Sequence, residues 1–176
     1  MQTPRRIRIS LHEKVMDKFE IVIETPGGSR AKYKYDTDKK HFAVKKLLPA
    51  GMVFPYDFGY IPGTTGEDGD PIDALVLAEF TTFTGCHIEC RLIGALLAEQ
   101  GKNGTRNDRF IFIPTSSFLF ENIKSINDLS EELVKQLTDF FINYNKAEGK
   151  QFEPLGLADA EKAGKMINAQ KKQAWQ

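Results

Sequence analysis

The sequence predicts a mainly β domain with flanking helices, and three observations support this. Five segments alternate apolar and polar residues with the period of two that a strand with one buried face requires. Turn-forming clusters at residues 26–29 (PGGS) and 101–104 (GKNG) lie between such segments, as they do between antiparallel neighbours. After Ser125 the apolar period becomes helical. A closed or nearly closed antiparallel sheet, followed by helices, is therefore expected.

The alternating segments give the expected strands in chain order. They are residues 19–23, 31–35, 74–78, 88–97 and 109–113. We expect them to form one sheet that carries the apolar core.

Two helices are expected after the strands. The apolar stripe of the first consists of Leu133, Val134, Leu137, Phe140, Phe141 and Tyr144. Ser130 or Asn127 can cap its start and Gly149 can end it, so the stripe is predicted to pack against the sheet. The second helix, at residues 159–170, has a narrow apolar face and is expected at the periphery or at a subunit contact.

Length and charge exclude several classes of protein. The chain has 176 residues, 41% of them hydrophobic, which fits a single domain over residues 1–176. Its 24 basic and 24 acidic residues balance, so no excess field draws it to nucleic acid or to an anionic membrane. No segment is long enough to span a bilayer. We predict a cytoplasmic protein.

The two cysteines do not indicate zinc. Cys86 and Cys90 flank His87, but a zinc site needs a fourth ligand. His12 and His41 lie far away in the chain and lack the paired spacing of zinc modules. Two reduced thiols on a strand beside a loop are expected.

The strongest chemical signal is the acidic turn, residues 68–73 (DGDPID). Asp68, Asp70 and Asp73 place three carboxylates within six residues, where like charges repel unless a cation lies among them. Ligation by oxygen atoms alone suits a hard divalent ion such as Mg²⁺ or Mn²⁺. The sequence therefore predicts that these three side chains are metal ligands.

A calcium loop and a plain surface turn are the alternatives to such a metal site. A calcium loop of the EF-hand type would need a ligand at Ile72, a glycine at Asp73 and a helix afterwards, and none of these is present. A solvent-facing acidic turn without a function is the second alternative. The residues that precede the turn decide between this alternative and a metal site.

An aromatic loop, residues 54–62 (FPYDFGYIP), precedes the acidic turn, and few surfaces carry such a loop without a use. Together the two segments resemble the signature of the soluble inorganic pyrophosphatases, an Asp-x-Asp-Pro-x-Asp turn preceded at this distance by an aromatic, Pro, Asn or Asp, aromatic, Gly, aromatic, Ile run. The strand end at residues 23–26, with Glu24 as a further candidate, the following Lys32, and the helix leading to Tyr144 extend the resemblance.

The resemblance implies a twisted five-stranded antiparallel OB-like β-barrel with flanking helices. It also implies Mg²⁺-dependent hydrolysis of inorganic pyrophosphate to two phosphates, with Mn²⁺ as the alternative metal. In this family pattern Asp68, Asp70 and Asp73 bind the metal. Asp70 is also the catalytic base that accepts the proton of the attacking water.

The resemblance further implies a set of residues that bind the phosphates. These are Lys32, Lys46, Tyr60, Arg109 and Tyr144. Cations and hydroxyls of this kind hold phosphate oxygens and offset the charge that develops on the leaving group. Taken singly, a lysine on a strand usually faces solvent, so these assignments depend on their matching positions.

The chain departs from the family pattern at several positions. Lys34 stands where a glutamate is usual, and it should share a strand face with Lys32. Lys46 replaces an arginine, Phe58 a tyrosine and Asn145 a lysine. Of these exchanges, those at Lys34 and Asn145 change the charge of the site.

The largest departure follows residue 97, where the family places two further metal-binding aspartates and then a lysine. Gln100, Asn107 and Arg109 align there. A slip of one residue would supply Glu99 and Asp108 instead, but on a strand it would reverse the face of the side chain unless the loop bulges. Both alignments are kept as alternatives.

The departures make the site about four charge units more positive, which should weaken the binding of the full set of metal ions. The first hypothesis is therefore a pyrophosphatase with reduced activity. The alternative is a catalytically weakened member that binds or acts on another phosphorylated ligand. An OB-like barrel that binds single strands is a third, and the balanced charge and acidic turn speak against it.

The resemblance also concerns assembly, because members of the family are usually homo-oligomers, either hexamers or dimers. Some hexamers place histidines at their subunit contact, on the helix that corresponds to residues 133–144. This chain has Asp139 and Asn143 in that helix instead. A homo-oligomer is expected, and both sizes remain open.

Overall fold

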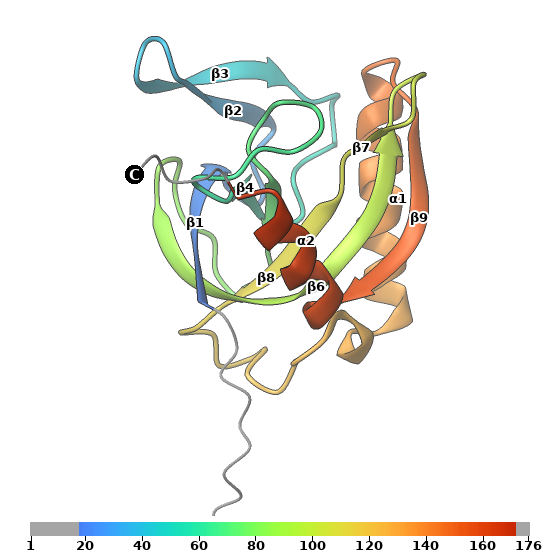
Figure 1. Ribbon diagram of the computed structural model, residues 1–176. Coiled ribbons are helices and arrows are strands. Elements are labelled where there is room, and N and C mark those ends of the chain that lie inside the picture. The colour runs from blue at the N-terminus through green and yellow to red at the C-terminus, as the bar shows by residue number, and fades with distance from the viewer. Residues whose placement is uncertain (1–17, 172–176) are drawn as a thin grey trace, which may run out of the picture.

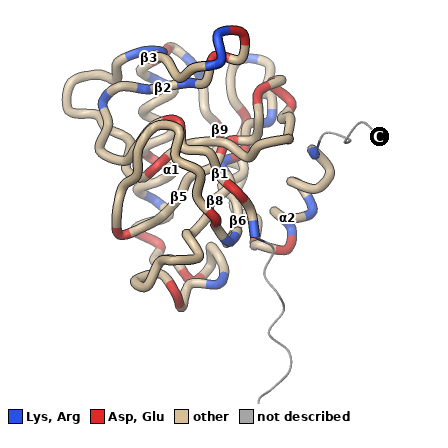
Figure 2. The backbone as a smooth tube through the Cα atoms, turned by 90° about the vertical axis from the view of Figure 1, so that its left-hand side faces the viewer, with Lys and Arg blue, Asp and Glu red and all other residues tan. Residues whose placement is uncertain are grey.

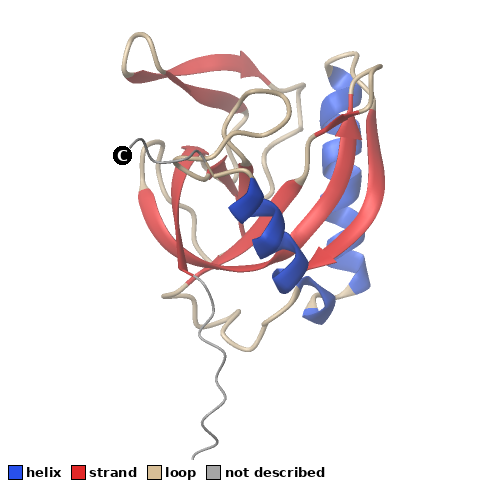
Figure 3. Cartoon of the chain, in the orientation of Figure 1, coloured by secondary structure: helices blue, strands red, loops and turns tan. Residues whose placement is uncertain are grey.

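The computed structural model describes residues 18–171, a curved sheet with a hairpin above it and two helices against it (Figures 1 and 3). The strands are β1 (Lys18–Thr25), β2 (Ala31–Asp36), β3 (His41–Leu47), β4 (Asp57–Tyr60), β5 (Asp73–Val76), β6 (His87–Gln100), β7 (Thr105–Arg106), β8 (Arg109–Pro114) and β9 (Phe152–Asp159). The helices are the 3₁₀ turn η1 (Ile126–Asp128), α1 (Glu131–Ala147) and α2 (Ala160–Ala169). None of these helices is long and apolar enough to cross a bilayer.

Five strands close into a barrel, which confirms the predicted fold class. The hydrogen-bonded order is β1-β4-β5-β8-β6, and β6 pairs with β1 to close the ring. β6 is long enough to pair with β1 at one end and with β9 at the other. One pairing differs from the expected antiparallel arrangement: β5 and β8 are parallel. The long connection through β6 allows this, because a parallel pair needs a crossover instead of a tight turn.

The sheet is buried on both faces, which explains why β8 is an unbroken apolar run after its first residue, Arg109. Phe110 and Phe112 belong to one core cluster, which also contains Ile167 of α2. Ile111 and Ile113 alternate with them and belong to a second cluster. Leu137, Phe141 and other residues of α1 complete that second cluster. The apolar stripe predicted for the first helix therefore packs against the sheet as expected.

The ends of both helices follow the local sequence. The hydroxyl of Ser130 accepts a hydrogen bond from the backbone N–H of Leu133 (3.2 Å) and caps α1. Gly149, just beyond the end of α1, has a φ of 69°, a left-handed conformation that favours glycine. Asp159 caps α2 by accepting from the N–H of Lys162 (2.8 Å).

The sequence pattern missed β3, β4 and β9. β2 and β3 form a two-stranded sheet of their own that stands above the barrel (Figure 1), so the expectation that residues 31–35 join the main sheet was wrong, and β4 is the fifth strand of the barrel. Since its residues are at most half-buried, no strict alternation marks β3. β4 lies within the aromatic loop, and its first three residues are all buried. The β2–β3 hairpin carries both lysines that the resemblance assigns to the site, Lys32 and Lys46, and also Lys34.

Asp57 anchors the aromatic loop, and we expect Asp57→Ala to destabilise the fold strongly. Its carboxylate is 4% exposed and accepts four hydrogen bonds, from Gly27 N (2.7 Å), Thr81 Oγ1 (2.7 Å), Thr82 N (2.8 Å) and Thr82 Oγ1 (2.6 Å). Alanine leaves these donors without an acceptor, which should lower the free energy of unfolding by about 3–5 kcal/mol.

Urea unfolding measures this loss. Asp139→Ala, at an exposed ion pair within α1, is the control and should leave the unfolding midpoint almost unchanged. Equal effects of the two substitutions would show that the Asp57 hydrogen bonds do not hold the loop.

Candidate active site

The acidic turn lies between β4 and β5 and leads directly into β5. Gly69 has a φ of 84°, which lets the chain reverse within the turn. Asp68 Oδ1 accepts a hydrogen bond from the backbone N–H of Asp70 (3.1 Å) and fixes the reversal. Asp73 is the first residue of β5 and pairs in register with Tyr60 of β4. The predicted metal ligands and one predicted phosphate ligand are therefore neighbours.

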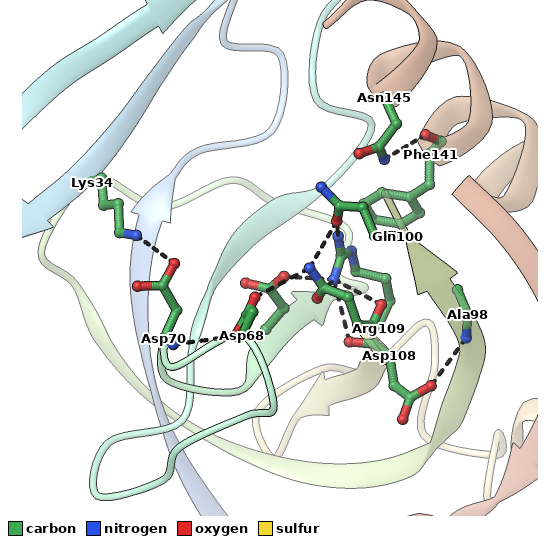
Figure 4. A network of polar contacts seen from close by, with 11 residues as sticks. Lys34, Asp68, Asp70, Ala98, Gln100, Asp108, Arg109, Phe141 and Asn145 are labelled. Carbon is green, nitrogen blue, oxygen red and sulfur yellow. Dashed lines mark hydrogen bonds and ion pairs between the residues drawn. The ribbon is translucent and has the colours of Figure 1, made fainter. Parts of the chain in front are cut away.

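Each carboxylate of the acidic turn has a nitrogen partner from another part of the chain (Figure 4). The pairs are Asp70 with Lys34 Nζ (2.6 Å), Asp73 with Arg109 (2.6 Å) and Asp68 with Asn107 Nδ2 (3.2 Å). Lys34 comes from the hairpin. Arg109 is the first residue of β8, and Asn107 lies two residues before it. The hairpin and the barrel thus meet at the acidic turn.

Gln100, Asn107 and Arg109 form one hydrogen-bonded network. Asn107 Nδ2 donates to Gln100 Oε1 (2.7 Å), and Arg109 donates to the same oxygen (3.3 Å). Arg109 also donates to the side-chain and backbone oxygens of Asn107. Arg109 is 4% exposed, and its guanidinium lies over the rings of Phe141 (5.2 Å) and Phe152 (5.7 Å). Its positive charge is therefore buried beneath the acidic turn and paired with Asp73, so a phosphate would have to displace this carboxylate before Arg109 could serve as the predicted phosphate ligand.

Glu99 and Asp108, the alternatives to Gln100 and Asn107, are placed differently. Asp108 borders the same crevice as Asp68, but its carboxylate accepts from the N–H of Ala98 (3.0 Å) and from Arg106 (2.6 Å). Glu99 lines a separate surface cleft together with lysines of α1 and of the loop that follows it. The structure thus brings Gln100 and Asn107, and not this second pair, into the network beside the acidic turn.

The carboxyl groups of the site crowd one another. Burial raises the pKa of Asp68, and the charges of Asp73 and Asp70 raise it further, against a lowering effect of the backbone hydrogen bond. Burial also raises the pKa of Glu24, with Asp73 adding to the effect and Lys32 opposing it. A cation placed among these groups would relieve their repulsion.

The donor atoms fit one divalent ion that brings further ligands with it. Among residues 18–171, no three Asp, Glu, His or Cys side chains surround a common point where a metal could bind. Mg²⁺, however, is usually held by one or two carboxylates, water and the phosphates of a substrate. Asp68 with Asp70 or Asp73 supplies that number of carboxylates.

The remaining candidates lie on the hairpin and on α1. Lys32 and Lys46 pair across the hairpin. Figure 2 shows basic residues along β2 and β3. Lys32 Nζ lies over the rings of Phe58 (5.5 Å) and Tyr144 (5.4 Å), and Lys46 Nζ over Tyr144 (4.4 Å). Burial lowers the pKa of Lys46, and the charge of Lys32 adds to this. Burial, with a smaller effect from the Glu24 charge, raises the pKa of Tyr60.

Glu148 is a site residue that sequence reasoning missed. It forms an ion pair with Lys46 and a second one with Lys150 (3.5 Å). Its position four residues after Tyr144 on the same helix face was the available signal. Asn145, which stands where the family has a lysine, is fully buried and donates to the backbone oxygen of Phe141 (2.8 Å).

Glu24→Gln should raise the stability of the protein at neutral pH. Glu24 is 7% exposed and accepts a hydrogen bond from the N–H of Tyr35 (2.9 Å), which glutamine can also accept. Because burial raises the folded-state pKa of Glu24, the folded protein retains this proton to a higher pH than the unfolded chain does. Protonated Glu24 therefore stabilises the fold at low pH. This contribution is lost as the pH rises from the pKa of Glu24 in the unfolded chain through its raised pKa in the folded protein.

Thermal unfolding at several pH values tests this. The variant should have the higher midpoint at pH 7, and the difference should vanish as the pH falls below the ordinary pKa of a glutamate, about 4.3. Glu153→Gln, at an exposed position of β9, is the control and should show no such pH dependence. A lower midpoint for Glu24→Gln at pH 7 would contradict the expectation.

Comparisons with known proteins point to one family. The family model described as inorganic pyrophosphatase matches residues 21–175. The inorganic pyrophosphatase of Synechocystis sp. is 38% identical over 141 residues, covering 80% of this chain and 82% of that protein. The inorganic pyrophosphatase of Halalkalibacterium halodurans is 36% identical over 160 residues, which cover 91% of this chain and 95% of that protein. The crystal structure of inorganic pyrophosphatase from Thermus thermophilus superposes with a TM-score of 0.81 at 31% identity, covering 89% of this chain and 91% of that one.

Proposed function

Since this chain belongs to the inorganic pyrophosphatase family, we propose that it hydrolyses inorganic pyrophosphate to two phosphates, with Mg²⁺ as the metal and Mn²⁺ as an alternative. One observation carries the proposal. The Lys34–Asp70 contact brings the acidic turn against the lysine-bearing hairpin. Carboxylates for a metal ion and cations for phosphate oxygens are then neighbours, as a phosphoanhydride hydrolase requires.

In this proposal Asp68, Asp70 and Asp73 are the carboxylates available to the metal, and Asp68 with either Asp70 or Asp73 would hold one ion. A divalent ion bound there would supply Lewis acidity toward phosphoryl oxygens and would lower the pKa of the attacking water. Asp70 first separates from Lys34 and then accepts the proton of the attacking water. The water oxygen forms a bond to one phosphorus, the bond from that phosphorus to the bridging oxygen breaks, and the second phosphate leaves with the bridging oxygen.

The basic residues and the tyrosines bind the substrate in the same proposal. Lys32 and Lys46 neutralise the phosphate oxygens, and Tyr60 and Tyr144 border their positions. Because Glu148 pairs with Lys46, an anionic substrate has to compete with this carboxylate for the ammonium. Binding energy from the phosphate groups would be used to break the pair, which favours substrates with high charge density.

The localisation, assembly and partners of the enzyme are also part of the proposal. We take it as a cytoplasmic homo-oligomer with a single catalytic domain in each chain. Its partner is free pyrophosphate, without nucleic acid or membrane. The equal numbers of acidic and basic residues, 24 each, support the absence of a polyanionic partner.

A second function is favoured by the ion pairs themselves. Asp70 and Asp73 are already neutralised by Lys34 and Arg109, so the site could bind a phosphorylated ligand without catalysing its hydrolysis. Such a protein would use the family fold for recognition alone. Turnover distinguishes it from an enzyme.

Phosphate release is the test. Pyrophosphate, tripolyphosphate, ATP and p-nitrophenyl phosphate are each supplied with Mg²⁺ or Mn²⁺, and EDTA gives the blank. We expect release from pyrophosphate with Mg²⁺ to exceed release from the other substrates. No release above the blank, together with calorimetric binding of pyrophosphate, would overturn hydrolysis and support the binding function.

A further inference from the structure

The guanidinium of Arg109 is a buried cation beside the acidic turn. It contacts the carboxylate of Asp73 (2.6 Å), the backbone oxygen of Asn107 (3.0 Å) and Gln100 Oε1 (3.3 Å). At 4% exposure, and packed over the rings of Phe141 and Phe152, it has little freedom to move. Because an arginine stays protonated in proteins, this positive charge is permanent.

The amides around it are arranged for an organic cation. Both amide oxygens, Gln100 Oε1 and Asn107 Oδ1, accept hydrogen bonds from Arg109. The amide nitrogen of Asn107 donates to Gln100 Oε1 (2.7 Å) and to Asp68 (3.2 Å). A hard dication needs oxygen ligands, whereas here N–H groups point at the oxygen of Asp68. The network therefore stabilises a guanidinium and disfavours a metal ion in the same place.

Lys34, on the hairpin, is the second cation in contact with the acidic turn. Its ammonium lies 2.6 Å from Asp70 Oδ2, and both side chains are partly exposed, at 38% and 55%. Three carboxylates and these two cations leave a net charge of −1 on the acidic turn and its partners. That charge suits one divalent ion and not several.

We propose that Arg109 and Lys34 are counter-cations supplied by the protein, in positions where divalent ions would otherwise bind to Asp73 and Asp70. The free protein then binds at most one divalent ion, and any further metal reaches the site bound to pyrophosphate. This inference rests on the proposed function for the identity of the ligand, but counting bound metal ions does not depend on turnover.

Binding of Mn²⁺ measures the number of ions directly. The electron paramagnetic resonance signal of free Mn²⁺ disappears as the ion binds, so titration of the full-length protein without pyrophosphate gives both stoichiometry and affinity. We expect no more than one Mn²⁺ per chain. Lys34→Gln removes the repulsion between the Lys34 ammonium and a bound Mn²⁺. Even at the dielectric constant of water, this should tighten Mn²⁺ binding about tenfold.

Matched variants separate this effect from a general change in charge. Lys18→Gln, which removes an exposed ion pair with Glu89 at the start of β1, should leave Mn²⁺ affinity unchanged. Gln100→Asp with Asn107→Asp restores two oxygen ligands and should add a second Mn²⁺. Two or more ions on the wild type, or equal effects of Lys34→Gln and Lys18→Gln, would overturn the inference.

Phosphate release measured on the same samples keeps the two proposals distinguishable. One Mn²⁺ with no turnover of pyrophosphate would support the counter-cations and contradict the enzyme. Turnover with two or more Mn²⁺ on the free wild type would support the enzyme and contradict the counter-cations.

Discussion

Asp70→Asn is expected to lower kcat for pyrophosphate hydrolysis by about 10²- to 10⁴-fold, the usual contribution of a general base. The amide fills the same space and still accepts a hydrogen bond from Lys34, but it cannot take the proton of the attacking water. Asp70 is 55% exposed, so the fold should be retained. KM should change less than kcat, because the loss falls on the transition state.

Steady-state phosphate release, with circular dichroism as a check of folding, measures this effect. Glu67→Gln, one residue before the acidic turn, is the matched control and should keep a rate close to that of the wild type. A near wild-type rate for Asp70→Asn would show that Asp70 is not the base.

The second large effect is expected from restoring the carboxylates. Lys34→Glu, Gln100→Asp and Asn107→Asp together should lower the Mg²⁺ concentration for half-maximal activity by on the order of 10²-fold and should raise the rate. Carboxylates are partners for a hard dication, and neutral amides and an ammonium are not. The three effects should be coupled, since the side chains share the same ions and the same hydrogen-bonded network.

Magnesium titrations of the single and triple variants measure both the midpoint and the coupling. A control with the same charge change elsewhere, Lys102→Glu with Asn143→Asp and Gln151→Asp at exposed positions, should behave like the wild type. An unchanged midpoint in the triple variant would indicate either that Glu99 and Asp108 serve the metal or that the site has another ligand.

The barrel was predictable where alternation and burial coincide. β1 alternates exposed and buried residues at its start, and β8 is an apolar run from Phe110 to Ile113 because both of its faces are buried. β9 was not predictable, since Pro154 and Gly156 interrupt it and Leu155 and Leu157 face outward. The parallel pairing of β5 with β8 depends on a crossover through β6, and local turn signals carry no information about such pairings.

The candidate site was predictable where its residues are contiguous. The acidic turn is visible as a motif because its three carboxylates lie within six residues. Its partners Lys34 and Arg109 each lie 36 residues from the carboxylate that they contact, Asp70 and Asp73, and only the folded chain brings them together.

The choice between Gln100 and Glu99 was likewise open in the sequence. Neighbouring residues on a strand face opposite sides, so only the register of β6 places Gln100 against Asn107.

The most direct test of hydrolysis by this site is turnover of pyrophosphate with Mg²⁺ in water enriched in oxygen-18, followed by mass spectrometry of the phosphate. Attack of water on one phosphorus should give two phosphates for each pyrophosphate, and at early times one of the two should carry a single labelled oxygen. Pyrophosphate that is bound in calorimetry but yields no labelled phosphate would contradict the enzyme and leave a protein that binds its ligand without hydrolysing it.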